Sequence, residues 1–220
     1  MKLTDARARE IFGQNFFGRE EWTQFYDERR DSDEYRSLSA LPWTESEVTA
    51  ACPFVKGKRI HETHFAFLGL ERLHGRPLTI EELRCLHPQS NQPHFFGKKE
   101  MRMEPVQMFE TEKTCKLEWH LMPLSFVPGT AGLPLKEQVR FLPEEYDVPF
   151  AIEEVLKDIL YFRRNRVYLN PKTHARTRDR FPHGVAHVGC FDGSGLQLGS
   201  WRSTLGHPWV GLGAIRRDWK

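Results

Sequence analysis

Ten histidines raise the question of whether this chain of 220 residues holds a metal or an acid–base site. His61 and His64 stand three residues apart with Glu62 between them. The zinc-protease helix instead places two histidines four residues apart and requires a third ligand downstream. In a strand, moreover, the two side chains would point to opposite faces. We therefore expect no metal site and no cofactor.

The remaining histidines and the cysteines fit structural roles. His87 and His94 flank a proline-containing loop, which predicts surface positions, and His120 beside Trp119 is expected to be a hydrogen-bonded core residue. The cysteines lie at least 30 residues apart without paired spacing, which indicates neither a zinc knuckle nor a disulfide framework. They are expected to be isolated buried thiols: Cys52, Cys85, Cys115 and Cys190.

Two glycine-rich pieces resemble catalytic or nucleotide-binding motifs only superficially. The piece 193–195 (Gly-Ser-Gly) lacks the first glycine of a nucleophile elbow, because Asp192 holds that place, and a strand pattern follows Ser194 instead of a helix. The piece 211–213 (Gly-Leu-Gly) lacks the third glycine and the βαβ frame of a dinucleotide fingerprint. Both pieces are interpreted as structural, and the chain is predicted not to be an enzyme.

Charge divides the chain into two unlike parts, although the net charge is only +2. Residues 161–220 contain eleven Lys or Arg and three acids, a net charge of +8, whereas the 21 basic and 27 acidic residues before them sum to −6. Such asymmetry indicates either an anionic partner or an acidic part that docks on a basic part. We favour docking, because the aromatic residues of the basic part alternate with glycines instead of forming a stacking platform. The alternative is a nucleic-acid-binding face formed by Arg163, Arg164, Arg166, Arg176, Arg178 and Arg180.

The sequence pattern divides the chain into a helical segment over residues 1–50 and an α+β body over residues 51–220. Helical spacing is clear over residues 6–12. Thr44 followed three residues later by Glu47 forms a capping box and predicts another helix start.

The best predicted helix spans residues 151–162. Its apolar residues fall on one face, which indicates a core helix packed against a sheet. Its charged residues Glu153, Glu154, Lys157 and Asp158 are expected to point outward. The fold class is therefore predicted as α+β, with helices packed on a mostly antiparallel sheet. The predicted core includes Leu156, Ile159, Leu160, Phe191, Leu196, Leu198, Leu212 and Ile215.

The C-terminal part is glycine-rich and strand-like over residues 185–191, 195–199 and 210–215. Turn residues separate these runs, so an antiparallel β-meander is predicted. The turn at 192–194 and the loop at 200–209 carry chemically mixed residues between regular strands, which is a common way to build a binding surface.

We predict a ligand-binding surface at this turn and loop. The two come together only if the middle strand is short, about five residues, and the loop folds back along the sheet face. Tryptophan and arginine supply the anchor types that dominate recognition. The expected ligand is a protein or a glycan. The predicted binding residues are Asp192, Gly193, Ser194, Ser200, Trp201, Arg202, Ser203, Thr204, Leu205, His207 and Trp209.

Several stretches are similar to a family of uncharacterised bacterial proteins, and the similarity covers nearly the whole chain. They are Ala8 to Gly18, Trp119 to Leu124 with Val127 to Gly129, Glu137 to Val139 with Leu142 to Pro149, and Val188 to Asp192 with Gly195-Leu196 and Gly211 to Gly213. The segment from about 183 to 220 resembles the variable proteins of diversity-generating retroelements. This resemblance implies a C-type-lectin-like fold that presents substituted positions for ligand binding. The calcium-binding carboxylate cluster of that fold is missing, so no calcium site is expected.

No stretch of the sequence approaches the roughly 18 consecutive apolar residues of a membrane span. The charged start, Met1 to Arg7, lacks the apolar core of a signal peptide. We therefore expect a cytoplasmic protein without a membrane span.

Overall fold

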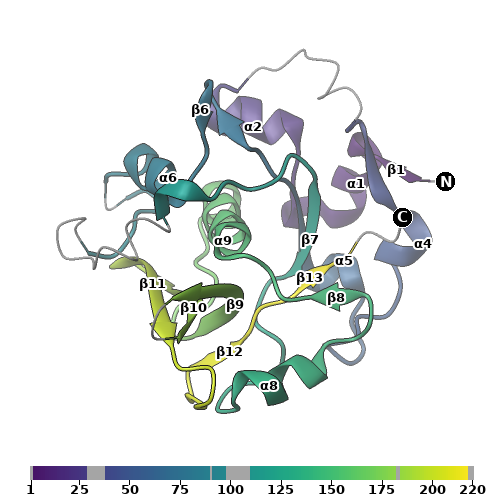
Figure 1. Cartoon of the computed structure of the whole chain (residues 1–220). Coiled ribbons are helices and arrows are strands. Elements are labelled where there is room, and N and C mark those ends of the chain that lie inside the picture. Colours follow the sequence, from purple (N-terminus) through teal and green to yellow (C-terminus); the bar gives the residue numbers. More distant parts are fainter. Residues whose placement is uncertain (1, 29–37, 90, 98–109, 182–183, 218–220) are drawn as a thin grey trace.

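A computed structural model describes residues 2–28, 38–89, 91–97, 110–181 and 184–217, and it confirms the predicted α+β class (Figure 1). Its helices are α1 (Asp5–Phe12), α2 (Arg19–Tyr26), α4 (Glu45–Val48), α5 (Ile60–Thr63), α6 (Ile80–Leu86), α8 (Leu135–Gln138) and α9 (Ala151–Asn165), with 3-10 turns η1 (Gly13–Asn15) and η3 (Val139–Phe141). Its strands are β1 (Lys2–Thr4), β2 (Phe16–Phe17), β3 (Ala40–Thr44), β4 (His64–Leu68), β5 (Arg72–Leu73), β6 (Arg76–Pro77), β7 (Trp119–Pro123), β8 (Tyr146–Asp147), β9 (His174–Phe181), β10 (Gly184–Asp192), β11 (Gly195–Trp201), β12 (Val210–Leu212) and β13 (Ile215–Arg216). None of these described helices is long and apolar enough to cross a membrane.

The short helices begin where local capping chemistry predicts. Thr4 Oγ1 accepts a hydrogen bond from the backbone N–H of Arg7 at 3.2 Å and starts α1. The capping box at α4 is complete, because Thr44 Oγ1 accepts from Glu47 N and the Glu47 carboxylate accepts from Thr44 N. Each cap satisfies backbone donors that a helix start leaves without partners.

Helix α9 lies at the centre of the molecule, between the C-terminal sheet and the N-terminal elements (Figure 1). The Glu153 carboxylate accepts from Phe150 N at 2.6 Å, and Asp179 of β9 accepts from Ala151 N at 2.6 Å, so both acids hold the helix start. The prediction of an outward charged face is wrong. Elements on all sides cover the helix and bury every residue from 151 to 162, including Glu153, Glu154, Lys157 and Asp158.

The C-terminal strands form a four-stranded sheet in the order β11-β10-β9-β12. Strands β10 and β11 form the predicted antiparallel hairpin. The third predicted run departs from a simple meander, because β12 crosses over and pairs in parallel with β9 at the far side of the sheet. Strand β9, which the sequence pattern did not indicate, therefore fills the centre of the sheet, with α9 packed on one face.

A single large hydrophobic cluster joins the first 50 residues to the rest of the chain. It contains Trp22 and Leu41 together with Phe65 of β4, Leu156 of α9 and Phe191 of β10. The parallel pair β2–β4 and the antiparallel pair β4–β7 form a second sheet, through which N-terminal phenylalanines reach α9.

Most of the predicted core residues are buried. Leu156, Ile159, Leu160, Phe191, Leu196 and Leu212 are completely enclosed, whereas Leu198 and Ile215 are only half-buried. All four cysteines are free thiols, as expected, but only Cys52 and Cys115 are buried, since Cys85 is exposed and Cys190 is half-buried.

Candidate functional site

The structure places the predicted turn and the start of the predicted loop at opposite ends of the β10–β11 hairpin. Asp192 pairs with Gly195 beside the turn, and Val185 pairs with Trp201 where the loop begins. Strand β11 has seven residues, longer than expected, so roughly 20 Å of strand separate the two ends. The turn side of β11 instead packs against residues 94–96, which exchange backbone hydrogen bonds with it. Asp192 itself accepts hydrogen bonds from the backbone N–H and hydroxyl of Ser194.

The loop folds back along the sheet, and a buried arginine holds it there. Arg176 lies in the middle of β9 and is completely enclosed. Its guanidinium donates to the backbone carbonyls of Leu205 at 2.7 Å and Arg202 at 3.4 Å. The same group donates to Leu133 O at 3.2 Å and Gln138 Oε1 at 3.0 Å. One side chain therefore joins the loop to the segment that leads into α8.

Backbone contacts tighten this attachment. Gly132 N donates to His207 O and Leu135 N donates to Ser203 O, each at 2.9 Å. At Gly206 the two segments approach so closely that a Cβ atom would lie 1.8 Å from the Gly132 carbonyl oxygen. Glycine is therefore required at position 206 by close packing, and the loop is part of the folded structure.

An aromatic and imidazole cluster lies beneath the loop. The rings of His174 and His187 pack at 4.4 Å between centroids, and Trp201 packs on His207 at 4.5 Å. Burial lowers the pKa of His187 to about 3 and that of His174 to about 4, with nearby His207 contributing to both. The imidazoles of His174 and His187 are therefore neutral at pH 7. Within the described part of the chain, Nδ1 of each and the indole N–H of Trp201 are buried without a hydrogen-bond partner.

The outer surface of the loop is chemically mixed. Trp209 is 54% exposed and Leu205 is 47% exposed, which is high for large apolar side chains. Arg202 and Thr204 are exposed, whereas Trp201, Ser203 and His207 are half-buried. Trp209 and Leu205 are therefore the residues most available to a partner.

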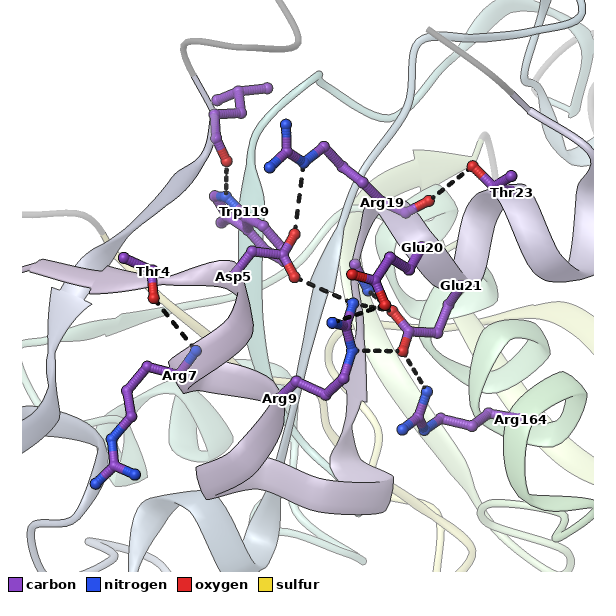
Figure 2. Close-up of polar contacts among 12 residues, drawn as sticks. Thr4, Asp5, Arg7, Arg9, Arg19, Glu20, Glu21, Thr23, Trp119 and Arg164 are labelled. Atoms are coloured by element: carbon purple, nitrogen blue, oxygen red, sulfur yellow. Dashed lines mark hydrogen bonds and ion pairs between the residues drawn. The ribbon is translucent and has the colours of Figure 1, made fainter.

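Most of the six arginines proposed for nucleic acid have internal roles. Arg176 is enclosed, Arg178 pairs with Asp147 at 2.5 Å, and Arg163 donates to the Phe25 carbonyl. Figure 2 shows Arg164 reaching from α9 to Glu21 of α2, where it donates at 2.6 Å. The basic and acidic parts of the chain therefore dock on each other, as the favoured interpretation of the charge asymmetry expects.

Glu21 belongs to a network of alternating charges that connects the N-terminal helices (Figure 2). Arg9 donates to both Glu21 and Asp5, and Arg19 lies 3.5 Å from the other Asp5 oxygen. Hydrogen bonds from Arg9, Gly18 N and Arg164 outweigh burial and lower the pKa of Glu21. This network is a structural joint between α1, α2 and α9.

A polar hollow of about 410 Å³ lies where β7, β8, β13 and the start of α9 meet. Four cationic side chains and three carboxylates line it, together with Trp119, His120, Phe150 and Ile215. The charged residues are Lys116, Arg178, Arg216 and Arg217 against Glu118, Asp147 and Glu153. None of these residues belongs to the ligand-binding surface that was predicted from the sequence.

His120 and Glu153 face each other in the polar hollow. His120 is almost fully buried, stacks on Phe67 at 5.0 Å and has Nε2 3.2 Å from the Cys115 sulfur. Its Nδ1 lies 4.0 Å from Glu153 Oε1, beyond hydrogen-bond distance. Burial lowers the pKa of His120 to about 4 and raises that of Glu153 to about 7. The expectation of His120 as a hydrogen-bonded core residue is thus confirmed, but the residue also lines the polar hollow.

Another buried charge cluster lies one turn further along α9. Lys157 pairs with Glu154 and lies 3.9 Å from Asp158, all three being nearly inaccessible. Burial raises the pKa of Asp158 well above its ordinary range. On the facing strand β4, His64 Nε2 lies 2.9 Å from the Tyr146 hydroxyl. Because Lys157 compensates the buried carboxylates beside it, this polar cluster is interpreted as structural.

Few of these arrangements were predictable from local sequence patterns. His87, predicted at the surface, is buried, and its ring lies 3.2 Å from the Tyr26 hydroxyl because α2 covers it. The useful signal was the position of Glu153, three residues after the N-cap residue Phe150, since a capping glutamate is drawn toward the helix start. Across the described ranges, no group of three or more His, Cys, Asp or Glu side chains is placed to hold a metal ion.

Comparison with known proteins yields no relative: no family model matches the chain, and no curated protein or solved structure is significantly similar to it.

Proposed function

We propose that this protein is a non-enzymatic binding protein that uses the folded-back loop 200–209 to contact a protein or glycan ligand. The observation that carries the proposal is the fixation of this loop by Arg176, which donates to two of its carbonyls from inside the sheet. A preordered loop loses less conformational entropy on binding than a mobile one. The loop therefore combines a fixed backbone with exposed contact groups.

The contact groups are Trp209 and Leu205, with Arg202 and Thr204 beside them. Tryptophan and arginine dominate the binding energy of many interfaces. The turn at Asp192–Ser194 lies at the other end of the hairpin, so we treat it as a separate contact that extends the surface only for a large ligand.

The proposal includes a C-type-lectin-like fold for the C-terminal segment. A C-type-lectin-like arrangement, in which C-terminal loops present substituted positions, is supported by the sequence resemblance and by the position of the loop between β11 and β12. A cytoplasmic location accords with the four free cysteines.

A binding screen against arrays of proteins, glycans and nucleic acids tests the proposal. The loop variant carries Arg202→Ala, Thr204→Ala, Leu205→Ala and Trp209→Ala, all at exposed positions that leave Arg176 in place. A turn variant carries Asp192→Ala and Ser194→Ala. The matched control is Phe141→Ala, since Phe141 is an aromatic residue with 48% exposure outside the loop.

The loop variant is expected to lose the ligand that the wild type and the Phe141→Ala control bind. If the folded loop variant binds the ligand as well as the wild type does, the loop 200–209 is not the binding surface. Binding of nucleic acid alone, with a steep salt dependence, would favour the basic-face alternative.

A further inference from the structure

The polar hollow has the composition of a site for a small anion. Arg178 and Arg217 converge on one oxygen of Asp147, at 2.5 and 3.5 Å, so two guanidinium groups stand side by side on its wall. Lys116 is exposed at its rim. Helix α9 begins at the same wall, and its N-terminus adds positive potential.

Arg216 provides a buried donor that the described part of the protein leaves unpaired. Its side chain is only 10% exposed, and its ion pair with Glu47 is long, at 3.5 Å. Among the described residues, its Nε is buried without a hydrogen-bond partner. Such a donor is costly to leave unsatisfied, so a ligand that accepts from it gains the full hydrogen bond.

The gap between His120 and Glu153 adds a second anchoring point. An oxygen about 2.8 Å from each of His120 Nδ1 and Glu153 Oε1 would bridge the 4.0 Å between them. The Cys115 sulfur at 3.2 Å and the Lys116 carbonyl oxygen at 3.5 Å both lie at Nε2, so Nδ1 is the ring nitrogen that faces this gap. A hydroxyl or carboxyl oxygen of a ligand fits between the two groups.

From these observations we infer that the polar hollow binds a small organic anion, bearing a carboxylate or phosphate that Arg216 and Lys116 hold and an oxygen that bridges His120 and Glu153. The volume of about 410 Å³ suits a compact metabolite. This site lies apart from the proposed binding loop and is independent of it.

Binding should be linked to a proton at Glu153. The charged groups around it are Arg178 and Asp179 of β9, Glu118 before β7, and His120, with the Cys115 thiol behind the imidazole. Burial raises the pKa of Glu153 to about 7, so its carboxyl is largely neutral below that pH. An entering anion avoids repulsion only in this state, and affinity should therefore rise as the pH falls from 8 to 6.

Titration calorimetry of the full-length protein with inorganic phosphate and with malonate, at low ionic strength, tests the site. The two probes distinguish phosphate from carboxylate recognition. Affinity in the millimolar range is expected for one of them, since such fragments make few contacts. Arg216→Gln and Lys116→Gln should each weaken binding about tenfold, whereas Arg180→Gln, at an exposed arginine of β9 that does not line the polar hollow, should not.

Glu153→Gln keeps an acceptor for the helix cap and should abolish the pH dependence of malonate binding, which is the informative probe here because phosphate itself titrates in this range. Absence of binding by both probes, or equal binding by Lys116→Gln and the wild type, would overturn the inference. Lys116→Gln serves as the second variant if Arg216→Gln does not fold, because Lys116 is exposed. The loop variant should bind the anion as the wild type does. The proposed binding loop and the proposed anion site can therefore be tested independently.

Discussion

The folded-back loop and the polar hollow use buried charge in opposite ways. In the loop, the two terminal nitrogens of Arg176 donate to four acceptors within the chain, although its Nε is buried without a partner among the described residues, and the outer surface left for a ligand consists of apolar and polar side chains. In the polar hollow, Arg216 keeps an unused donor, and the His120–Glu153 pair stays open by 4.0 Å. The terminal donors of Arg176 therefore stabilise a surface, whereas the separated polar groups of the hollow leave room for a ligand.

The largest effect is expected for Lys157→Met in the centre of α9. Lys157 pairs with Glu154 beside Asp158, and all three are buried, so removing the cation leaves two carboxylates without compensation. The free energy of unfolding should fall by about 3–5 kcal/mol, measured by urea denaturation. Lys58→Met, at an exposed lysine paired with Glu62, is the control and should cost less than about 0.5 kcal/mol. A loss below about 1 kcal/mol in Lys157→Met would contradict the structural role of the cluster.

Arg176→Met tests the fixation of the loop. Four acceptors lose a charged donor, so the free energy of unfolding should fall by about 2–4 kcal/mol. Limited proteolysis should then cut within residues 200–209. Arg180→Met, at an exposed position of the same strand, should leave both stability and the cleavage pattern unchanged. Protection of the loop in Arg176→Met would mean that the contacts to Gly132 and Leu135 suffice to hold it.

His187→Gln should reduce the acid lability of the loop region. Burial lowers the pKa of His187 from its ordinary 6.5 to about 3, so its stabilising contribution is complete above pH 6.5 and is lost as the pH falls toward 3. Across that window, the free energy of unfolding of the variant should fall by up to about 1.4 kcal/mol less per pH unit than that of the wild type. Urea denaturation at several pH values measures the difference. Identical pH profiles for the variant and the wild type would show that the imidazole is solvated.

The smallest effect on stability is expected for Trp209→Ala. Trp209 is 54% exposed, so the free energy of unfolding should change by no more than about 0.5 kcal/mol. The same substitution should abolish ligand capture if Trp209 is the anchor of the loop. A large loss of stability would instead assign this residue to the fold and remove it from the binding surface.

Local structure was predictable to a large extent. The caps at Thr4 and Thr44, the helix over α9 and the β10–β11 hairpin follow from side-chain chemistry and spacing within a few residues. The expected surface was only partly predictable, because the length of β11 set the turn and loop at opposite ends while the loop still folded back along the sheet.

The sequence by itself determined where helices begin and which face of α9 is apolar, and its charge asymmetry favoured docking of the basic final part on the acidic first part over a nucleic-acid-binding face. Those properties depend on neighbours in the chain or on the sum of charges. Only the tertiary structure decided that the charged face of α9 is also covered, that β12 pairs with β9, and that Arg176 lies under the loop. An apolar stripe shows that one face of a helix must be buried. The charged face can be buried as well when side chains from distant segments pair with its charges. The polar hollow depends on residues 116–120, 147–153, 178 and 215–217 meeting, and no local pattern carries that information.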